Sequence, residues 1–348
     1  MTNSASNDLQ IPRTPKASEK VHIEILDGWR ALSIVFVLAA HWLPLGPSNW
    51  QVNASIGASG MALFFCLSGF LITQFLYADQ RVGVFLIRRI FRIVPLAWAA
   101  IGILVLANGV GLSTTAANFL FVANLPPEKL MIGGAHLWSL CVEFQFYIFM
   151  ALLVLIGGQK AIFAVPAFTI AVTLFRIYAG ETISIVTWHR VDEIFIGGCV
   201  ALAWNNKTIS AYFRNVSALL APVFLVGLIL VSLPQSGVLG YARPYFAGAA
   251  IFASLYAFPR PLYRLWTCKT ARYVAQISYA LYVVHGMLTA TALGGEDVSK
   301  IEKYLLRIPL ALLTWLISHC STFYYEKAAI GLGRQLAEKL GSRQSRPI

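Results

Sequence analysis

The sequence contains few charged residues. Only 12% of its 348 residues are Asp, Glu, Lys or Arg, about half the share of an ordinary soluble domain. Apolar residues make up 58%, which is more apolar surface than so few charges can cover in water. The composition excludes a soluble enzyme and a disordered or collagen-like chain, and it indicates a polytopic membrane protein.

Several motifs of known chemistry are also missing. The five cysteines show neither the spacing of metal ligands nor a disulfide framework. There is no Walker loop, dinucleotide fingerprint or zinc-protease motif. Ser68 and Gly69 lack the G-x-S-x-G elbow of a covalent serine. We therefore expect no metal, no tightly bound cofactor and no nucleic-acid partner.

Ten apolar segments dominate the chain, and a spanning helix needs about 20 mostly apolar residues. They cover about residues 29–46, 60–77, 90–108, 136–156, 161–179, 192–205, 216–233, 243–258, 275–293 and 305–325. The expected fold is all-α, with about ten transmembrane helices in one domain over residues 24–326. Residues 1–23 are polar and lack a signal-peptide core, so we expect a disordered cytoplasmic tail there and a basic cytoplasmic tail at 327–348.

The basic residues predict the orientation of these helices. The chain has 27 Lys and Arg against 15 Asp and Glu. With the N-terminus inside, twenty of the basic residues fall in cytoplasmic segments and six in outer ones. This bias is typical of cytoplasmic loops. It favours ten helices with both termini in the cytoplasm.

Ionisable residues inside the apolar segments are costly and call for a partner or a function. Arg30 and His41 are eleven residues apart, so they share one helix face about 16 Å apart. Arg30 could instead be an interfacial anchor and His41 a packed core residue. His136, Glu143 and Tyr147 share another face. Glu143 could approach His41, or could form a structural ion pair.

Two further groups of charges stand near helix ends. Arg88, Arg89 and Arg92 could clamp a polyphosphate, because guanidinium groups bind phosphate bidentately. Positive-inside anchoring would also place arginines there. Arg190 and Asp192 could position a polar acceptor on the outer side, or could be an interfacial charge cluster.

These motifs together resemble the acyltransferase 3 family of bacterial membrane-bound O-acyltransferases, which modify surface and exported glycans. The resemblance covers about residues 24–326 and rests on the motifs at 26–30 with His41, 64–72, 89–92, 136–143, 190–192 and 277–285. Two motifs depart from the family pattern. Phe144 stands where a second glutamate is frequent, and Glu326 is followed by Lys-Ala instead of Arg-Pro. We therefore assign no role to Glu326. We assign none to His285 either, because a histidine in its position is more often a packed core residue than a catalyst.

The resemblance implies acyl transfer, usually of acetyl, from cytoplasmic acyl-CoA to a glycan or lipid-linked saccharide reached from the outer side of the bacterial cytoplasmic membrane. It assigns His41 as general base, with Glu143 as orienting partner. The donor residues are Arg30, Arg88, Arg89 and Arg92, and the acceptor residues are His136, Trp138, Arg190 and Asp192. The alternatives are a transporter of a polar or anionic solute, with the same charges lining its pathway, and a non-catalytic scaffold.

Overall fold

The computed structural model describes residues 23–295 and 298–344, and within these ranges it contains helices and no β-strand. A helix overlaps each of the ten predicted apolar segments, which confirms the all-α fold. The principal helices are α1 (Glu24–Trp42), α2 (Val52–Ala78), α3 (Val82–Asn108), α4 (Leu112–Phe119), α5 (Trp138–Gly157), α6 (Val165–Ala179), α7 (Asp192–Asn205), α8 (Lys207–Tyr212), α9 (Leu220–Val231), α10 (Arg243–Ser254), α11 (Arg260–Trp266), α12 (Lys269–Thr289), α13 (Lys300–Cys320) and α14 (Lys327–Gln344).

The number of membrane spans is less settled than the helical content. In the described ranges six helices are long and apolar enough to cross a membrane, or seven if the bent pair around α8 and α9 forms one span. Helices α7, α9 and α10 have only 14, 12 and 12 residues, fewer than the roughly 20 of a straight span. Ten spans and cytoplasmic termini therefore stay a prediction. The disordered tail predicted for residues 1–23 also stays a prediction, because all of these residues except residue 23 lie outside the described ranges.

Glycines let helices α2 and α7 touch along their backbones. A Cβ at Gly69 would lie 1.8 Å from the carbonyl oxygen of Ile194, and one at Gly197 would lie 1.9 Å from that of Cys66. No side chain other than hydrogen fits at either position. Small residues at such crossings are the usual way for membrane helices to pack closely, and this contact fixes α2 and α7 as the centre of the bundle.

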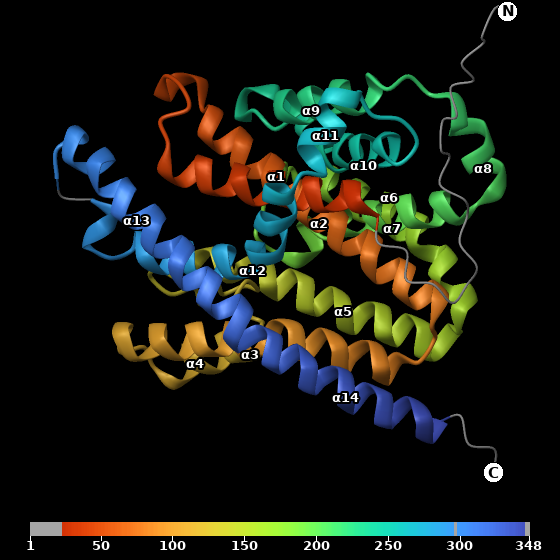
Figure 1. Ribbon diagram of the computed structural model, residues 1–348, viewed down its shortest axis with the longest axis horizontal. Coiled ribbons are helices and arrows are strands. Elements are labelled where there is room, and N and C mark those ends of the chain that lie inside the picture. The colour runs from red at the N-terminus through yellow and green to blue at the C-terminus, as the bar shows by residue number, and fades with distance from the viewer. Residues whose placement is uncertain (1–22, 296–297, 345–348) are drawn as a thin grey trace, which may run out of the picture.

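Helix α1 packs beside α2 and α12, and these three helices frame the site described below (Figure 1). On the other side of the bundle α14 runs along α3 (Figure 1). Gly333 of α14 lies against the ring of Phe91, and Leu340 lies against Gly83. Residues 327–344, predicted as part of a tail, thus form a helix packed on the bundle, while 345–348 lie outside the described ranges.

Candidate active site

One face of α1 connects two groups of ionisable side chains. It carries, in order, Arg30, Ile34, Val37 and His41. Steps of four, three and four residues keep these side chains on one stripe of an α-helix. The structure therefore supports the predicted alignment of Arg30 with His41, with two apolar side chains between them.

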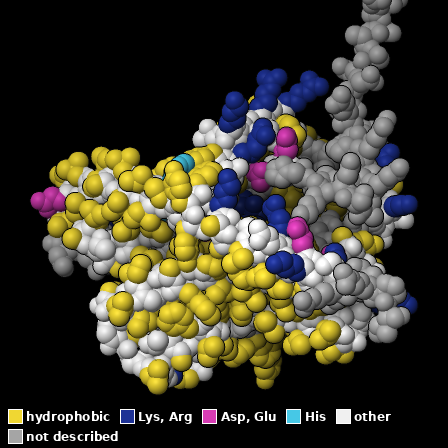
Figure 2. Space-filling model, turned by 60° about the horizontal axis from the view of Figure 1, so that its bottom comes forward, with side chains coloured by type: hydrophobic (Ala, Val, Ile, Leu, Met, Phe, Trp, Pro, Cys, Tyr) yellow, Lys and Arg dark blue, Asp and Glu magenta, His cyan; other side chains and the backbone are white. Residues whose placement is uncertain are grey.

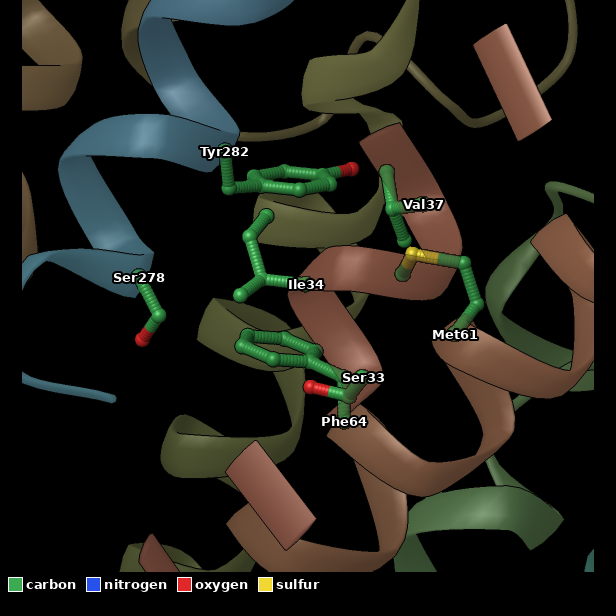
Figure 3. A pocket seen from close by; sticks show the side chains of 7 residues that line it. All are labelled: Ser33, Ile34, Val37, Met61, Phe64, Ser278 and Tyr282. Carbon is green, nitrogen blue, oxygen red and sulfur yellow. The ribbon is translucent and has the colours of Figure 1, made fainter. Parts of the chain in front are cut away.

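A narrow cavity lies on this stripe, beside the two apolar residues that separate Arg30 from His41 (Figure 3). It is lined by Ser33, Ile34 and Val37 of α1, Met61 and Phe64 of α2, and Ser278 and Tyr282 of α12. The rings of Phe64 and Tyr282 stack with their centres 6.0 Å apart. The free volume for water-sized spheres is about 10 Å³, which is room for a single water molecule. The cavity is apolar and partly open.

At one end of the cavity three histidines come together. The ring of buried His285 on α12 lies between those of His41, at 5.1 Å, and His136, at 4.7 Å. His41 is exposed and its Nδ1 lies 2.7 Å from the carbonyl oxygen of Val37. Within the described residues no group of His, Cys, Asp or Glu has the arrangement of a metal site. The cluster is therefore best considered as a set of bases.

Tyr282 fixes the segment that carries His136. Its hydroxyl donates to the carbonyl oxygen of His136 and accepts from Ser139 Oγ at 2.6 Å. His136 Nε2 lies 3.0 Å from the carbonyl oxygen of Val283. Sequence reasoning did not single out these contacts, because they join residues about 145 positions apart. The structure brings His136 together with His41 through His285.

At the other end of the cavity lie the arginines. Arg30 is within electrostatic range of Arg92, Arg89, Asp27 and Glu143. The guanidinium of Arg88 lies over the ring of Phe75 at 5.6 Å. That of Arg89 lies over the ring of Tyr147 at 5.7 Å, while Arg92 is exposed. The space-filling view shows Lys and Arg side chains gathered on part of one face, with Asp and Glu among them and apolar side chains over most of the rest (Figure 2). The structure thus brings the four predicted donor residues into one region.

Glu143 joins the arginine end. Its Oε1 accepts hydrogen bonds from Ser68 and Tyr147, each at 2.5 Å. It is buried, and it lies within electrostatic range of Arg30 and Arg89. The hydrogen bonds of Glu143 and of His41 go to different partners, so the structure brings Glu143 together with the arginines and not with the histidine cluster.

Two of the four predicted acceptor residues belong to a buried charge cluster, which consists of Arg176, Arg190, Asp192, Glu193 and Arg243. Asp192 is paired with Arg176. Glu193 Oε1 accepts from Arg243 Nε at 2.7 Å, and its Oε2 lies 3.1 Å from Arg190 Nε. All five side chains are at most 2% exposed. Arg190 and Asp192 therefore sit inside the protein, and neither presents its polar atoms to an open surface.

Trp138 connects this cluster to the histidines. Its ring lies between the guanidinium of Arg190, at 5.4 Å, and the ring of Phe65, at 5.8 Å. Since Trp138 follows η2 (Ala135–Leu137), the segment that carries His136, its fixed ring also holds that segment. Trp138 thus connects the buried charge cluster, through packing contacts, to the segment that carries His136.

Glu326 is a further buried carboxylate near the arginine end. It ends the π-helix η8 (Ser321–Glu326), a form of helix that is frequent at functional sites. Thr322 and Ser321 donate to its Oε1 at 3.0 and 3.3 Å, and it is within electrostatic range of Arg92. Its departure from the family pattern at the next two residues hid this position from sequence reasoning.

Comparisons with known proteins agree with this arrangement. A family model described as an acyltransferase domain matches residues 23–324. Nodulation protein 10 of Rhizobium leguminosarum is 23% identical over 85% of this chain and 91% of its own length. The peptidoglycan O-acetyltransferase OatA of Listeria monocytogenes is 24% identical over 78% of this chain. The putative peptidoglycan O-acetyltransferase YrhL of Bacillus subtilis is 27% identical over 56%.

The chain spans 50% of the length of OatA and 36% of that of YrhL. No solved structure matches the chain. The family match covers most of the chain and includes both ends of the cavity on α1. The chain therefore belongs to the acyltransferase 3 family and is a multi-pass membrane acyltransferase.

Proposed function

We propose that the protein transfers an acyl group, most simply acetyl, from acyl-CoA on the cytoplasmic side to a hydroxyl of a glycan or lipid-linked saccharide on the outer side of the bacterial cytoplasmic membrane. The observation that carries this proposal is the stripe on α1, with arginines at one end, a histidine cluster at the other and an apolar cavity between. The rise of the helix separates Arg30 from His41 by about 16 Å. An extended pantetheine arm has about the right length for this path.

The donor phosphates bind at the arginine end. Arg30, Arg89 and Arg92 supply forked donors that match phosphate oxygens, and Arg88 stands one turn from Arg92. Glu143 holds this group in place, because its carboxylate accepts from Tyr147, on whose ring Arg89 lies. The pantetheine arm then separates the stacked rings of Phe64 and Tyr282 and fills the cavity.

His41 is the general base of the transfer. A carbonyl oxygen only accepts hydrogen bonds, so the contact with Val37 places the proton on Nδ1 and leaves a lone pair on Nε2. Nε2 takes the proton of the acceptor hydroxyl while its oxygen attacks the thioester carbonyl. The new C–O bond forms, the C–S bond breaks, and the proton of His41 passes to the sulfur of CoA. Positioned acid–base groups of this kind contribute about 10²–10⁴-fold.

The acceptor approaches the exposed side of His41, and His136 lies on the other side of His285 from it. The protein interior behind this end contains Trp138, Arg190 and Asp192, whose contacts are with other groups of the protein. They support the acceptor site without contacting the acceptor. A glycan acceptor and an acetyl group are supported by the names of two relatives, which are peptidoglycan O-acetyltransferases.

The experiment uses the purified protein in lipid nanodiscs with acetyl-CoA labelled in the acetyl group and a soluble peptidoglycan fragment as acceptor. We expect labelled fragment from the wild type. His41→Ala should lower turnover by about 10²–10⁴-fold and leave acetyl-CoA binding unchanged. The matched control is His189→Ala, because His189 is partly exposed and stacks on Phe175 outside the site. Full turnover by His41→Ala would contradict the proposal.

A further inference from the structure

The end of the cavity nearest His41 is where the acyl group of the donor has to lie. The ring of His41 is turned back along α1, as helical side chains usually are, so that its Nδ1 contacts the carbonyl oxygen of Val37. The thioester carbonyl must reach the acceptor oxygen that His41 deprotonates, and it therefore comes to the same helical turn. The side chain of Val37 also lines the cavity. The wall at this turn is the surface that the acyl group meets.

Val37 and Met61 form the wall at this turn. Helices α1 and α2 run in opposite directions, because Gly57 faces Ala40 and Gly60 faces Val37. Met61 follows Gly60 and lies at the level of Val37, with its sulfur beside that side chain (Figure 3). Val37 is β-branched and rigid, and a Cβ at Gly60 would already lie 3.2 Å from its Cγ2. Met61 is 8% exposed. Its side chain therefore sets how far the cavity extends at this end.

Little space remains here for an acyl group. The whole cavity has a free volume of about 10 Å³ for water-sized spheres, and the pantetheine arm takes up this volume. The acyl group then packs directly against Val37 and Met61. Acetyl ends in a single methyl at this wall, whereas propionyl and butyryl carry one and two further methylenes. Forcing extra methylenes into a packed interior displaces side chains and is unfavourable. A longer acyl group thus fits only if the wall is cut back.

We propose that Met61 restricts the transferred group to acetyl, because its side chain occupies the space that a longer acyl chain needs. This inference rests on the proposed function and adds to it the residue that selects the donor. The reaction is the same for every acyl group, since the C–O bond forms, the C–S bond breaks and CoA leaves as the thiol. Discrimination comes from the added methylenes alone. One methylene in an apolar pocket changes specificity by about 10–200-fold.

Competition between donors tests this selection. The purified protein in lipid nanodiscs receives acetyl-CoA and butyryl-CoA together with a soluble peptidoglycan fragment, and mass spectrometry gives the ratio of butyrylated to acetylated product. Met61→Ala removes three heavy atoms and butyryl adds two, so we expect this ratio to rise at least about tenfold. Met61→Val removes less of the wall and should raise the ratio by less. Both donors compete in one sample, so the ratio does not depend on the fraction of the protein that is folded.

Two variants serve as matched controls. Met61→Leu nearly keeps the volume of methionine. Met150→Ala removes the same atoms from a buried methionine of α5 outside the lining of the cavity. Neither control should change the ratio.

Three results would overturn the inference. They are equal use of both donors by the wild type, an unchanged ratio in Met61→Ala, and an equal rise in Met150→Ala. An equal gain for hexanoyl-CoA in Met61→Ala would also contradict it, because four added methylenes exceed the space that the substitution opens. Failure of the proposed function has a different signature, which is no acylated fragment from the wild type or full turnover by His41→Ala.

Discussion

The protein contains two groups of arginines that differ in what neutralises them. In the buried charge cluster, Arg176, Arg190 and Arg243 meet Asp192 and Glu193, and none of these side chains is more than 2% exposed. At the arginine end of the cavity, Arg88, Arg89 and Arg92 lie over aromatic rings or are exposed. The buried carboxylates near them, those of Glu143 and Glu326, accept their hydrogen bonds from hydroxyls. Carboxylates of the protein itself neutralise the first group, and the second retains guanidinium donors for an anion.

The kind of partner that neutralises an arginine distinguishes arginines that stabilise the fold from arginines that can bind a ligand. The residue type alone does not make this distinction. Burying an ion pair is costly, but removing one partner is costlier because it leaves an uncompensated charge. An exposed arginine that loses its ligand simply returns to water. Substitutions in the buried charge cluster should therefore change stability first, and substitutions at the arginine end should change donor affinity first.

The largest effect is expected for Glu193→Gln. It leaves Arg190 and Arg243 without the carboxylate that both contact. Breaking a buried pair costs about 3–5 kcal/mol, so the thermal midpoint of the purified protein should fall steeply. Glu128→Gln, at an exposed position, is the matched control and should have no effect. An unchanged midpoint with lost acceptor binding would instead make this cluster part of the acceptor site.

The next effect is on donor affinity. The double variant Arg89→Ala and Arg92→Ala should raise the KM for acetyl-CoA by at least about tenfold, because each charge-assisted hydrogen bond contributes about 1.5–3 kcal/mol. The two Lys replacements should recover only part, since lysine lacks the bidentate fork. The thermal midpoint should stay unchanged, as for the exposed control Arg264→Ala. If the midpoint falls while KM holds, these arginines anchor the fold.

Much of this arrangement follows from the sequence. Apolar segments specify helices because a spanning backbone must satisfy its own hydrogen bonds, and a helix overlaps all ten predicted segments. The face shared by Arg30 and His41 follows from the helical period alone. Both residues lie on one helix, so their common face can be predicted without knowing how the helices pack.

Contacts between helices could not be predicted in the same way. The partner of Glu143 depends on how α5 is rotated against α2, and Ser68 is 75 positions away. The pairing of Arg176 with Asp192 depends on the crossing of α6 and α7. His285 was expected to be a core residue, and it is buried, but its free Nε2 is visible only once the rings of His41 and His136 are placed. Depth in the membrane alone does not determine these contacts.

A smaller effect is expected for Tyr147→Phe, which tests how Glu143 serves the arginine end. The change removes one hydrogen bond to Glu143 and keeps the ring under Arg89. A hydrogen bond to a carboxylate contributes about 1.5–3 kcal/mol. Because Ser68 still holds Glu143, only part of this is lost at the arginine end, and the KM for acetyl-CoA should rise about two- to tenfold with kcat unchanged. Tyr273→Phe is the control, because that hydroxyl contacts His319 outside the site. A fall in kcat alone would place Glu143 in the proton-transfer step.

The smallest effect is expected for an exposed ion pair between α2 and α3, where Arg81 contacts Asp79 through two side-chain hydrogen bonds of 2.9 and 2.7 Å. These bonds hold the pKa of Asp79 below its usual range. A depressed folded-state pKa adds stability above the unfolded-state pKa, and this stability is lost as the pH falls through the folded-state value.

Arg81→Ala should therefore cost about 0.2–1 kcal/mol at neutral pH, the range of exposed pairs, and the difference from wild type should vanish once the pH falls below the range in which aspartate ionises. High salt should shrink the difference at neutral pH too, because solvent ions screen an exposed pair far better than a buried one. Thermal midpoints of both proteins at neutral and acidic pH, with and without added salt, provide the measurement. A loss as large as that of Glu193→Gln would mean that exposure does not separate the two kinds of arginine in this protein.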